Sequence, residues 1–212
     1  FLLHGFIPAQ QLIHEIIEDP LMEFRHFTVE DGLSKNNISS LYQDRFGYLW
    51  IGTPHGLNRF NGKYFTNYFH DPGDNTSILS NNIMCFAEDR EDNLWIGTDA
   101  GLTRYIREKD CFETFQVPGM DSLLPGKYIR AIYFDDDSIV YLGFTEGWFV
   151  RYDMANNMTS WHQHFPDDQP YYYYYSIYED SRGIIWYGGR GTGLYKYFKE
   201  NDSSIVIKTM QI

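Results

Sequence analysis

The sequence predicts an all-β protein made of four-stranded antiparallel blades, the architecture of a β-propeller. Three observations predict it: a motif that recurs four times, short strand-like runs within each copy, and an excess of aromatic residues. The copies are marked by an aspartate at positions that are 45, 46 and 45 residues apart, namely Asp44, Asp89, Asp135 and Asp180. A four-stranded unit of about 45 residues is the length of one propeller blade.

The composition favours strands and excludes several other classes of protein. Of the 212 residues, 43% are hydrophobic and 18% are aromatic, and aromatic side chains favour pleated, half-buried surfaces. A formal net charge of −12 repels phosphate backbones and anionic membrane surfaces, so we expect no nucleic-acid binding and no membrane contact by this segment. Two cysteines, Cys85 and Cys111, are too few for a disulfide scaffold, and we expect both to be free thiols.

Residues 1–22 are expected to be an N-terminal extension that precedes the blades. The apolar run that ends at Ala9 is either the tail of a signal peptide or an ordinary extension. Residues 23–28 resemble the segments Thr66–Phe69 and Glu113–Phe115, so we expect an outer strand of a preceding or closing blade there. Four blades and one orphan strand indicate part of a larger propeller of about seven blades. We expect this partial propeller to occupy residues 23–212.

The first blade is expected over residues 36–70. Its strands are predicted at Ile38–Tyr42, Tyr48–Thr53, Leu57–Phe60 and Lys63–Phe69. The Asp44 side chain can accept from a backbone N–H two residues on, and Gly47 supplies a positive φ, so a turn joins the first two strands. The pair Asn61-Gly62 predicts a tight hairpin before the fourth strand.

The other blades follow from alignment to the first, over residues 81–117, 127–165 and 172–212. One aligned column is uniformly small and fits the crowded inner edge of a propeller: Ser40, Cys85, Ala131 and Ser176. A second column is aromatic, and its side chains are predicted to be the large wedges that pack between the faces of neighbouring blades: Trp50, Trp95, Tyr141 and Trp186. Two residues later comes a glycine where a neighbour must approach closely: Gly52, Gly97, Gly143 and Gly188. These residues, with Asp44, Gly47, Asp89, Asp180 and Gly183, are interpreted as structural.

The first two copies resemble the two-component regulator propeller repeat. The first copy reads Gln43-Asp44-Arg45-Phe46-Gly47-Tyr48-Leu49-Trp50-Ile51-Gly52-Thr53, followed by Gly56-Leu57. The resemblance spans about residues 23–198. The third copy departs from it, with Asp135-Asp136-Asp137-Ser138 and Tyr141, and the fourth inserts a residue at Arg190-Gly191-Thr192.

The resemblance implies that this segment belongs to the periplasmic sensor of a membrane-bound histidine kinase, which is often a hybrid protein. Such kinases are common in Bacteroidetes, and many of them respond to polysaccharide breakdown products. The resemblance also implies that this segment is not itself an enzyme and needs no cofactor. Its implied partners are an oligosaccharide or other small ligand, the remaining blades, and a second copy of the full-length sensor.

Loops that lead into the innermost strands reach the rim of the central channel, and their residues differ from blade to blade. Tyrosine rings offer stacking faces, and Asn and Arg offer directed hydrogen bonds, so we expect these residues to suit sugars or their acid derivatives. The candidate ligand-binding residues are Asn37, Asn82, Lys127, Tyr128, Arg130, Tyr173 and Tyr175. The alternative is that the Asn residues make turn hydrogen bonds and the Tyr residues fill space between blades.

Catalysis and metal binding have little support in the sequence. His162 and His164 alternate on one predicted strand, but no third ligand accompanies them, so no metal site is expected. The motif aspartates recur once per blade, as scaffold residues do. Two other functions stay open: a protein-interaction or assembly propeller, and a glycan-active propeller enzyme such as a lyase or glycosidase.

Overall fold

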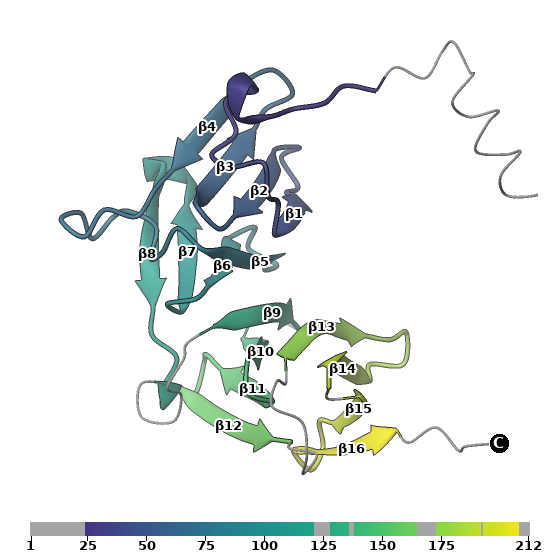
Figure 1. Cartoon of the computed structure of the whole chain (residues 1–212). Helices are drawn as coiled ribbons and strands as arrows, with labels where there is room; N and C mark the ends of the chain where they lie inside the picture. The colour runs from purple at the N-terminus through teal and green to yellow at the C-terminus, as the bar shows by residue number, and fades with distance from the viewer. Residues whose placement is uncertain (1–23, 121–127, 136–137, 165–172, 192, 208–212) are drawn as a thin grey trace, which may run out of the picture.

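The described residues of the chain form four antiparallel sheets, each made of four consecutive strands (Figure 1). The structure is a computed structural model and describes residues 24–120, 128–135, 138–164, 173–191 and 193–207. The predicted extension 1–22 and Lys127 therefore lie outside the described residues. The prediction of an all-β propeller of four-stranded blades is confirmed.

The strands have the following bounds. Blade 1 holds β1 (Ser40–Gln43), β2 (Leu49–Thr53), β3 (Gly56–Phe60) and β4 (Phe65–Tyr68); blade 2 holds β5 (Ile83–Glu88), β6 (Leu94–Thr98), β7 (Leu102–Ile106) and β8 (Cys111–Phe115). Blade 3 holds β9 (Ile129–Phe134), β10 (Ile139–Phe144), β11 (Trp148–Asp153) and β12 (Met158–Gln163); blade 4 holds β13 (Tyr173–Glu179), β14 (Ile185–Arg190), β15 (Gly193–Phe198) and β16 (Ser203–Ile207). Two 3-10 turns, η1 (Val29–Asp31) and η2 (Arg107–Lys109), complete the described elements.

Of the outer strand predicted at residues 23–28, the described residues 24–28 belong to no sheet, and Glu23 lies outside the described residues. The ring of Phe27 instead packs on Phe60 and Phe65, at centroid distances of 5.1 and 5.5 Å. Thr28 then caps the η1 turn through a hydrogen bond from the Glu30 amide. Because these contacts are made by side chains and a cap, the segment lies against blade 1 without joining its ladder.

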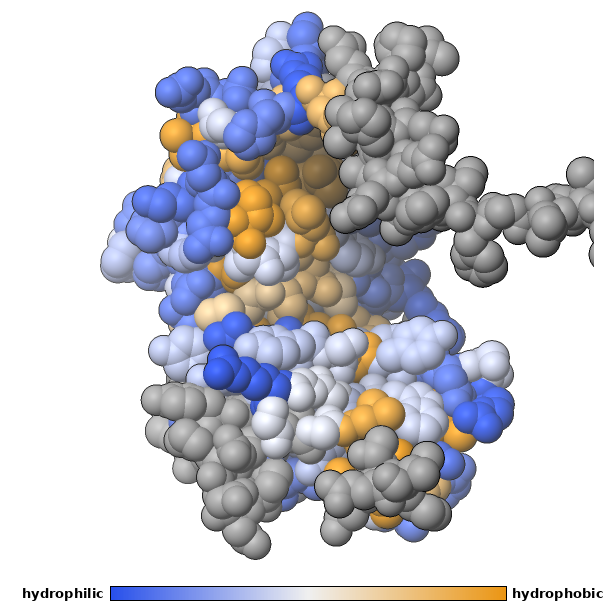
Figure 2. Space-filling view, turned by 45° about the vertical axis from the view of Figure 1, so that its right-hand side comes forward, coloured by the Kyte–Doolittle hydropathy of each residue, from blue (hydrophilic) through white to orange (hydrophobic). Residues whose placement is uncertain are grey.

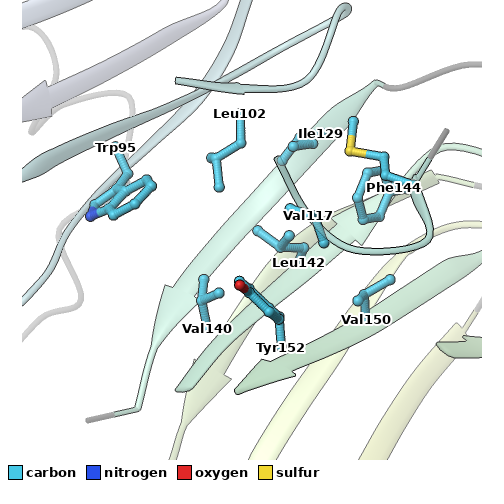
Figure 3. Packing of buried hydrophobic residues seen from close by; sticks show 10 residues of the cluster. Trp95, Leu102, Val117, Ile129, Val140, Leu142, Phe144, Val150 and Tyr152 are labelled. Atoms are coloured by element: carbon cyan, nitrogen blue, oxygen red, sulfur yellow. The ribbon is translucent and has the colours of Figure 1, made fainter. Parts of the chain in front are cut away.

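The blades follow one another along an arc, with β1, β5, β9 and β13 on its inner side (Figure 1). Each seam between consecutive blades holds its own apolar cluster, and Figure 3 shows the one between blades 2 and 3. There Trp95 and Leu102 of blade 2 face Val140, Leu142 and Tyr152 of blade 3. The core of the molecule is thus a series of blade-to-blade interfaces.

The motif glycines sit where the next blade approaches most closely. A Cβ added to Gly52 would lie 2.7 Å from the Cγ2 of Ile83, and one added to Gly97 would lie 2.9 Å from the Cγ2 of Ile129. The small-residue column lies beside these glycines, since Gly52 pairs with Ser40 and Gly97 with Cys85. Any larger side chain at either position would clash both with the small residue of its own blade and with the innermost strand of the following blade.

The motif aspartate joins a turn to the aromatic wedge of its own blade. In blade 1 the carboxylate of Asp44 accepts hydrogen bonds from the amides of Phe46 (3.0 Å) and Tyr48 (2.9 Å) and from the indole of Trp50 (2.9 Å). The indoles of Trp95 and Trp186 donate in the same way to Asp89 and Asp180, at 2.7 and 3.0 Å. The Asp–Trp pair therefore fixes each wedge against its turn.

Within the part of the chain that the structure describes, two of the three seams add an ion pair between the motif aspartate and the following blade. Arg107 of blade 2 reaches Asp44 of blade 1 at 2.8 Å, and Lys199 of blade 4 reaches Asp135 of blade 3 at 2.7 Å. The residue at the corresponding place in blade 3 is Met154, which packs on the apolar cluster of its seam. Successive seams thus use different chemistry at one repeated position.

Candidate ligand site at the inner rim

Three of the residues expected to bind ligand come together where blades 3 and 4 meet. The guanidinium of Arg130, on β9, lies 5.2 Å from the ring centroid of Tyr173 and 5.6 Å from that of Tyr175, both on β13. The two tyrosine rings are 6.0 Å apart. A cation that lies over two neighbouring aromatic rings is attracted by the negative face of each ring. We call Tyr128, Arg130, Tyr173 and Tyr175 the inner rim site.

The backbone of β13 determines which tyrosines reach this site. Tyr174 is completely buried and packs in the opposite direction, 5.1 Å from the ring of Tyr187. The ladder to β14 shifts register between Tyr174 and Ser176, so Tyr175 has no partner there. This irregularity leaves the Tyr175 side chain 48% exposed. A buried Tyr174 and an unpaired Tyr175 thus put two of the tyrosines beside Arg130.

Arg130 carries an uncompensated charge at this rim. Within the described residues its guanidinium makes no ion pair, and its Nε is buried without a hydrogen-bond partner. It also lies near Cys85 of blade 2, where burial raises the pKa of the thiol to about 12 and the positive charge of Arg130 partly opposes that shift. Since leaving a buried donor unpaired costs free energy, the arrangement suits an acceptor brought by a ligand.

The remaining candidates divide between this site and other blades. Tyr128 is 39% exposed, and its carbonyl accepts from the amide of Thr145, which forms a bridge with Tyr173. Asn82 lies in blade 2, where its side-chain amide donates to Asp99 at 3.1 Å. Asn37 is exposed in blade 1, and Lys127 lies outside the described residues. Only Tyr128 thus extends the site around Arg130.

Arg190 is a residue near this site that the sequence analysis did not single out. It ends β14 directly opposite Tyr173 in the antiparallel ladder and is exposed. Directly opposed residues project from the same face of a sheet, so Arg190 shares the face of Tyr173. The one-residue insertion at Arg190-Gly191-Thr192 was the available signal, because it interrupts the motif where the rim is built.

No group of three potential metal ligands occurs in the described part of the chain. His162 of β12 and His164, which directly follows β12, instead join blade 3 to blade 4. His162 contacts Asp202 at 2.9 Å, and His164 contacts the Ser204 hydroxyl at 2.8 Å. Cys85 and Cys111 are both free thiols.

The fold and its seams define a β-propeller assembled from repeated blades. The sequence model of the two component regulator propeller family matches residues 32–55, 77–100 and 168–191. These matches fall on blades 1, 2 and 4, so the chain carries repeats of this family, as its motifs predicted. No helix among the described residues has the length and apolarity needed to cross a membrane.

Two solved structures and one curated protein illustrate the relationship. The extracellular domain of a putative one component system from B. thetaiotaomicron has a TM-score of 0.68 and 21% identity, and the match covers 87% of this chain and 27% of that one. The extracellular domain of a putative hybrid two component system from the same organism has a TM-score of 0.57 and 20% identity, and the match covers 85% of this chain and 31% of that one. Both show the fold alone.

Histidine kinase P4 of Formosa agariphila is 47% identical to this chain over 55 residues. The match covers 26% of this chain and 4% of the kinase, so this chain corresponds to a small part of such proteins. These findings support a place among the propellers of two-component regulators.

Proposed function

We propose that this chain is part of the sensing propeller of a membrane-bound two-component sensor kinase and that it binds a carbohydrate-derived ligand at the inner rim site. The family repeats and the kinase relative support the sensor role. The extracellular neighbours support a position outside the cytoplasm, in the periplasm.

One observation supports the choice of site: Arg130 lies beside both Tyr173 and Tyr175 without an acid partner among the described residues. Sugar rings stack on aromatic faces through their C–H groups, while hydroxyl and carboxyl oxygens accept from guanidinium N–H groups. The same three side chains therefore offer both kinds of contact to a single ligand.

The site also suggests how binding would be transmitted. Arg130 belongs to blade 3 and both tyrosines belong to blade 4, so a ligand that contacts all three bridges the seam. Binding would favour one setting of the two blades over others, as differential affinity requires. The remaining blades and a second full-length copy are the proposed recipients of that change.

Catalysis is not part of the proposal. The carboxylates of Asp44, Asp89 and Asp180 are occupied by turn amides and by an indole of their own blade. They lie on three different blades and so offer no carboxylate pair.

Thermal unfolding in the presence of a panel of acidic and neutral oligosaccharides tests the function. A ligand at 100 times its dissociation constant adds about 2.7 kcal/mol to the free energy of unfolding. We expect one glycan class to raise the Tm, Arg130→Ala to abolish the effect, and Arg25→Ala to preserve it, since Arg25 lies far along the chain against Phe27. No shift with any glycan, for a folded protein, would instead favour a protein-interaction propeller.

A further inference from the structure

We propose that the inner rim site selects ligands that carry an anionic group, a carboxylate or sulfate, held between Arg130 and Arg190. This inference rests on the proposed function and assigns its ligand class. It also assigns to Arg190 a role in specificity.

The first step is the position of the two arginines. Arg130 faces the ring of Tyr173 from blade 3 at 5.2 Å. Arg190 is the cross-strand neighbour of the same Tyr173 within blade 4. Cβ atoms of directly opposed residues are about 5 Å apart, which is within the length of an arginine side chain. Both guanidinium groups can therefore reach the surroundings of one tyrosine.

The second step is that these two charges lack partners in an acidic chain. Most arginines of the described blades are paired with carboxylates: Arg45 with Asp92, Arg59 with Asp110, Arg104 with Glu113, Arg107 with Asp44 and Glu88, Arg151 with Asp153, and Arg182 with Asp180. Arg130 and Arg190 make no ion pair within the described residues. Glu146, which follows the Tyr173-bridging Thr145, pairs with neither. Two uncompensated cations at one rim, in a chain of net charge −12, produce a local positive site.

The third step is the chemistry of recognition. A guanidinium binds a carboxylate or sulfate through two parallel N–H···O bonds, and charge-assisted bonds of this kind are stronger than neutral ones. A neutral sugar would stack on Tyr173 and Tyr175 but would leave both positive charges without a counter-charge. The site therefore discriminates by charge at the arginines and by ring shape at the tyrosines.

The contacts surrounding the arginines make the variants easy to interpret. Arg190 is exposed, so Arg190→Ala should leave the Tm of the unliganded protein unchanged. Arg190→Lys keeps the charge but removes the paired donor geometry. Arg25→Ala removes an arginine elsewhere and is the matched control.

The experiment measures binding by the whole chain of D-glucuronate, D-glucose and each glycan that raises the Tm, at constant ionic strength, by NMR of the arginine Nε–H signals. We expect glucuronate to shift the signals of Arg130 and Arg190, and glucose to leave them unchanged. For an acidic glycan, Arg190→Ala should weaken binding roughly 10- to 100-fold. Added salt should weaken binding of the acidic glycan further.

Each outcome decides between the two proposals. If the stabilising glycans are neutral and Arg190→Ala has no effect, the anionic selectivity is wrong while the sensing function stands. If Arg25→Ala weakens binding as much as Arg190→Ala, the effect is long-range charge and the assignment of Arg190 is wrong. If no glycan raises the Tm and glucuronate shifts neither arginine signal, the proposed function fails together with the inference.

Discussion

Asp44 connects three parts of the molecule through one carboxylate. It holds its own turn, the indole of Trp50 and the guanidinium of Arg107 from the next blade. Burial alone would raise the pKa of this carboxyl, but the hydrogen bonds from Trp50 and Arg107 outweigh burial and lower it. Glu88 pairs with the same Arg107, yet there burial prevails and the pKa is raised. Arg107 thus bridges two carboxylates, one in each blade, at 2.8 Å from both.

Replacement of this carboxylate should cost more in blade 1 than in blade 2. Asp44→Asn removes the charge that faces Arg107, and breaking a buried ion pair costs about 3 kcal/mol. Asp89→Asn is the matched variant, because Asp89 accepts from Trp95 and Asn93 but pairs with no cation among the described residues of blade 3; it should cost about 1 kcal/mol. Urea unfolding of both variants measures the difference. Equal losses would show that the seam ion pair contributes nothing.

Gly97 is a second residue whose role depends on the neighbouring blade. A Cβ there would lie 2.9 Å from both the Cγ2 and the carbonyl oxygen of Ile129, so Gly97→Ala should destabilise the chain by about 1–3 kcal/mol through overpacking. Gly73→Ala is the control, since its nearest contact would be the Asp71 carboxylate at 3.3 Å. The free energies of unfolding from urea titration provide the comparison. A loss at Gly73 as large as at Gly97 would mean that close approach is not the cause.

The residues that could be predicted from the sequence are those that recur in every blade. Gly97 and Trp95 were identifiable because each stands in a column of four similar residues. The role of Arg107 could not be predicted in this way, because the aligned residues in the following blades, Met154 and Lys199, differ from it and from each other. The role of this position depends on a contact between blades, which alignment within one chain does not reveal. Arg190 was missed for the related reason that an insertion places it outside the repeat.

At the scale of elements, the seam between blades 2 and 3 differs from the other two at the position that holds Arg107 in blade 2 and Lys199 in blade 4. In blade 3 this position is occupied by Met154, which makes apolar contacts. Met154 there packs with Trp95 and Phe134 in one cluster. Asp89 and Met154 line a cavity of about 200 Å³ that also borders Trp95 and Arg104. The seam thus has both a carboxylate and the space for a longer basic side chain.

A lysine at position 154 should therefore stabilise this seam. Met154→Lys can place an ammonium group near Asp89, as Lys199 does near Asp135 at 2.7 Å. We expect a gain of up to about 1 kcal/mol relative to Met154→Gln, because the pair is partly exposed. The test is a double-mutant cycle with Asp89→Asn, which should remove the gain. A gain that survives Asp89→Asn would not come from this ion pair.

The strands themselves were predictable because turn residues separate apolar runs in every copy. The first strand was expected at Ile38–Tyr42 and is found at Ser40–Gln43, while Leu57–Phe60 lies within β3. The exception is the segment 24–28, whose residues resemble those of the outer strands of blades 1 and 2 but form no strand. Strand formation needs a hydrogen-bonding neighbour, and Phe27 packs on blade 1 by its ring instead. The irregular backbone at Tyr175 was likewise invisible, since a register shift depends on both strands.

At the scale of the whole molecule, acid should unfold the chain through its paired carboxylates. Hydrogen bonds and ion pairs lower the pKa values of Asp44, Asp110, Asp180, Asp202 and Glu179, against the opposing effect of burial. A carboxyl group whose pKa is lower in the folded than in the unfolded chain stabilises the fold at pH values above its unfolded pKa, about 4. That stability is lost as the pH falls through the pKa of the group in the folded chain. His164, whose pKa burial lowers, adds a smaller loss that begins below about pH 6.5.

We therefore expect the urea midpoint to be constant from pH 8 to 7, to fall slightly towards pH 5 and to fall steeply below pH 4. Circular dichroism at each pH measures it. His164→Gln should remove the first decline and leave the second. A midpoint that is unchanged at pH 3 would show that these carboxylates gain nothing on folding.

The two ends of the arc leave blade faces uncovered. Leu41 of blade 1 is 61% exposed and Tyr178 of blade 4 is 64% exposed, although the aligned residues Phe86 and Tyr133 pack inside seams. Figure 2 shows apolar side chains gathered in the upper part of the inner face, where blades 1 and 2 lie. These faces have the chemistry of seams that lack their second blade.

Charge substitution at an open face should thus be tolerated where the same change within a seam is not. Leu41→Lys should alter the free energy of unfolding by less than about 0.5 kcal/mol. Phe86→Lys replaces the aligned residue, which lies 6.3 Å from the ring of Tyr42, and should cost more than about 2 kcal/mol. Thermal unfolding at two protein concentrations measures both. A large loss for Leu41→Lys that grows with concentration would mean that a second copy covers this face, whereas a loss independent of concentration would contradict the open arc.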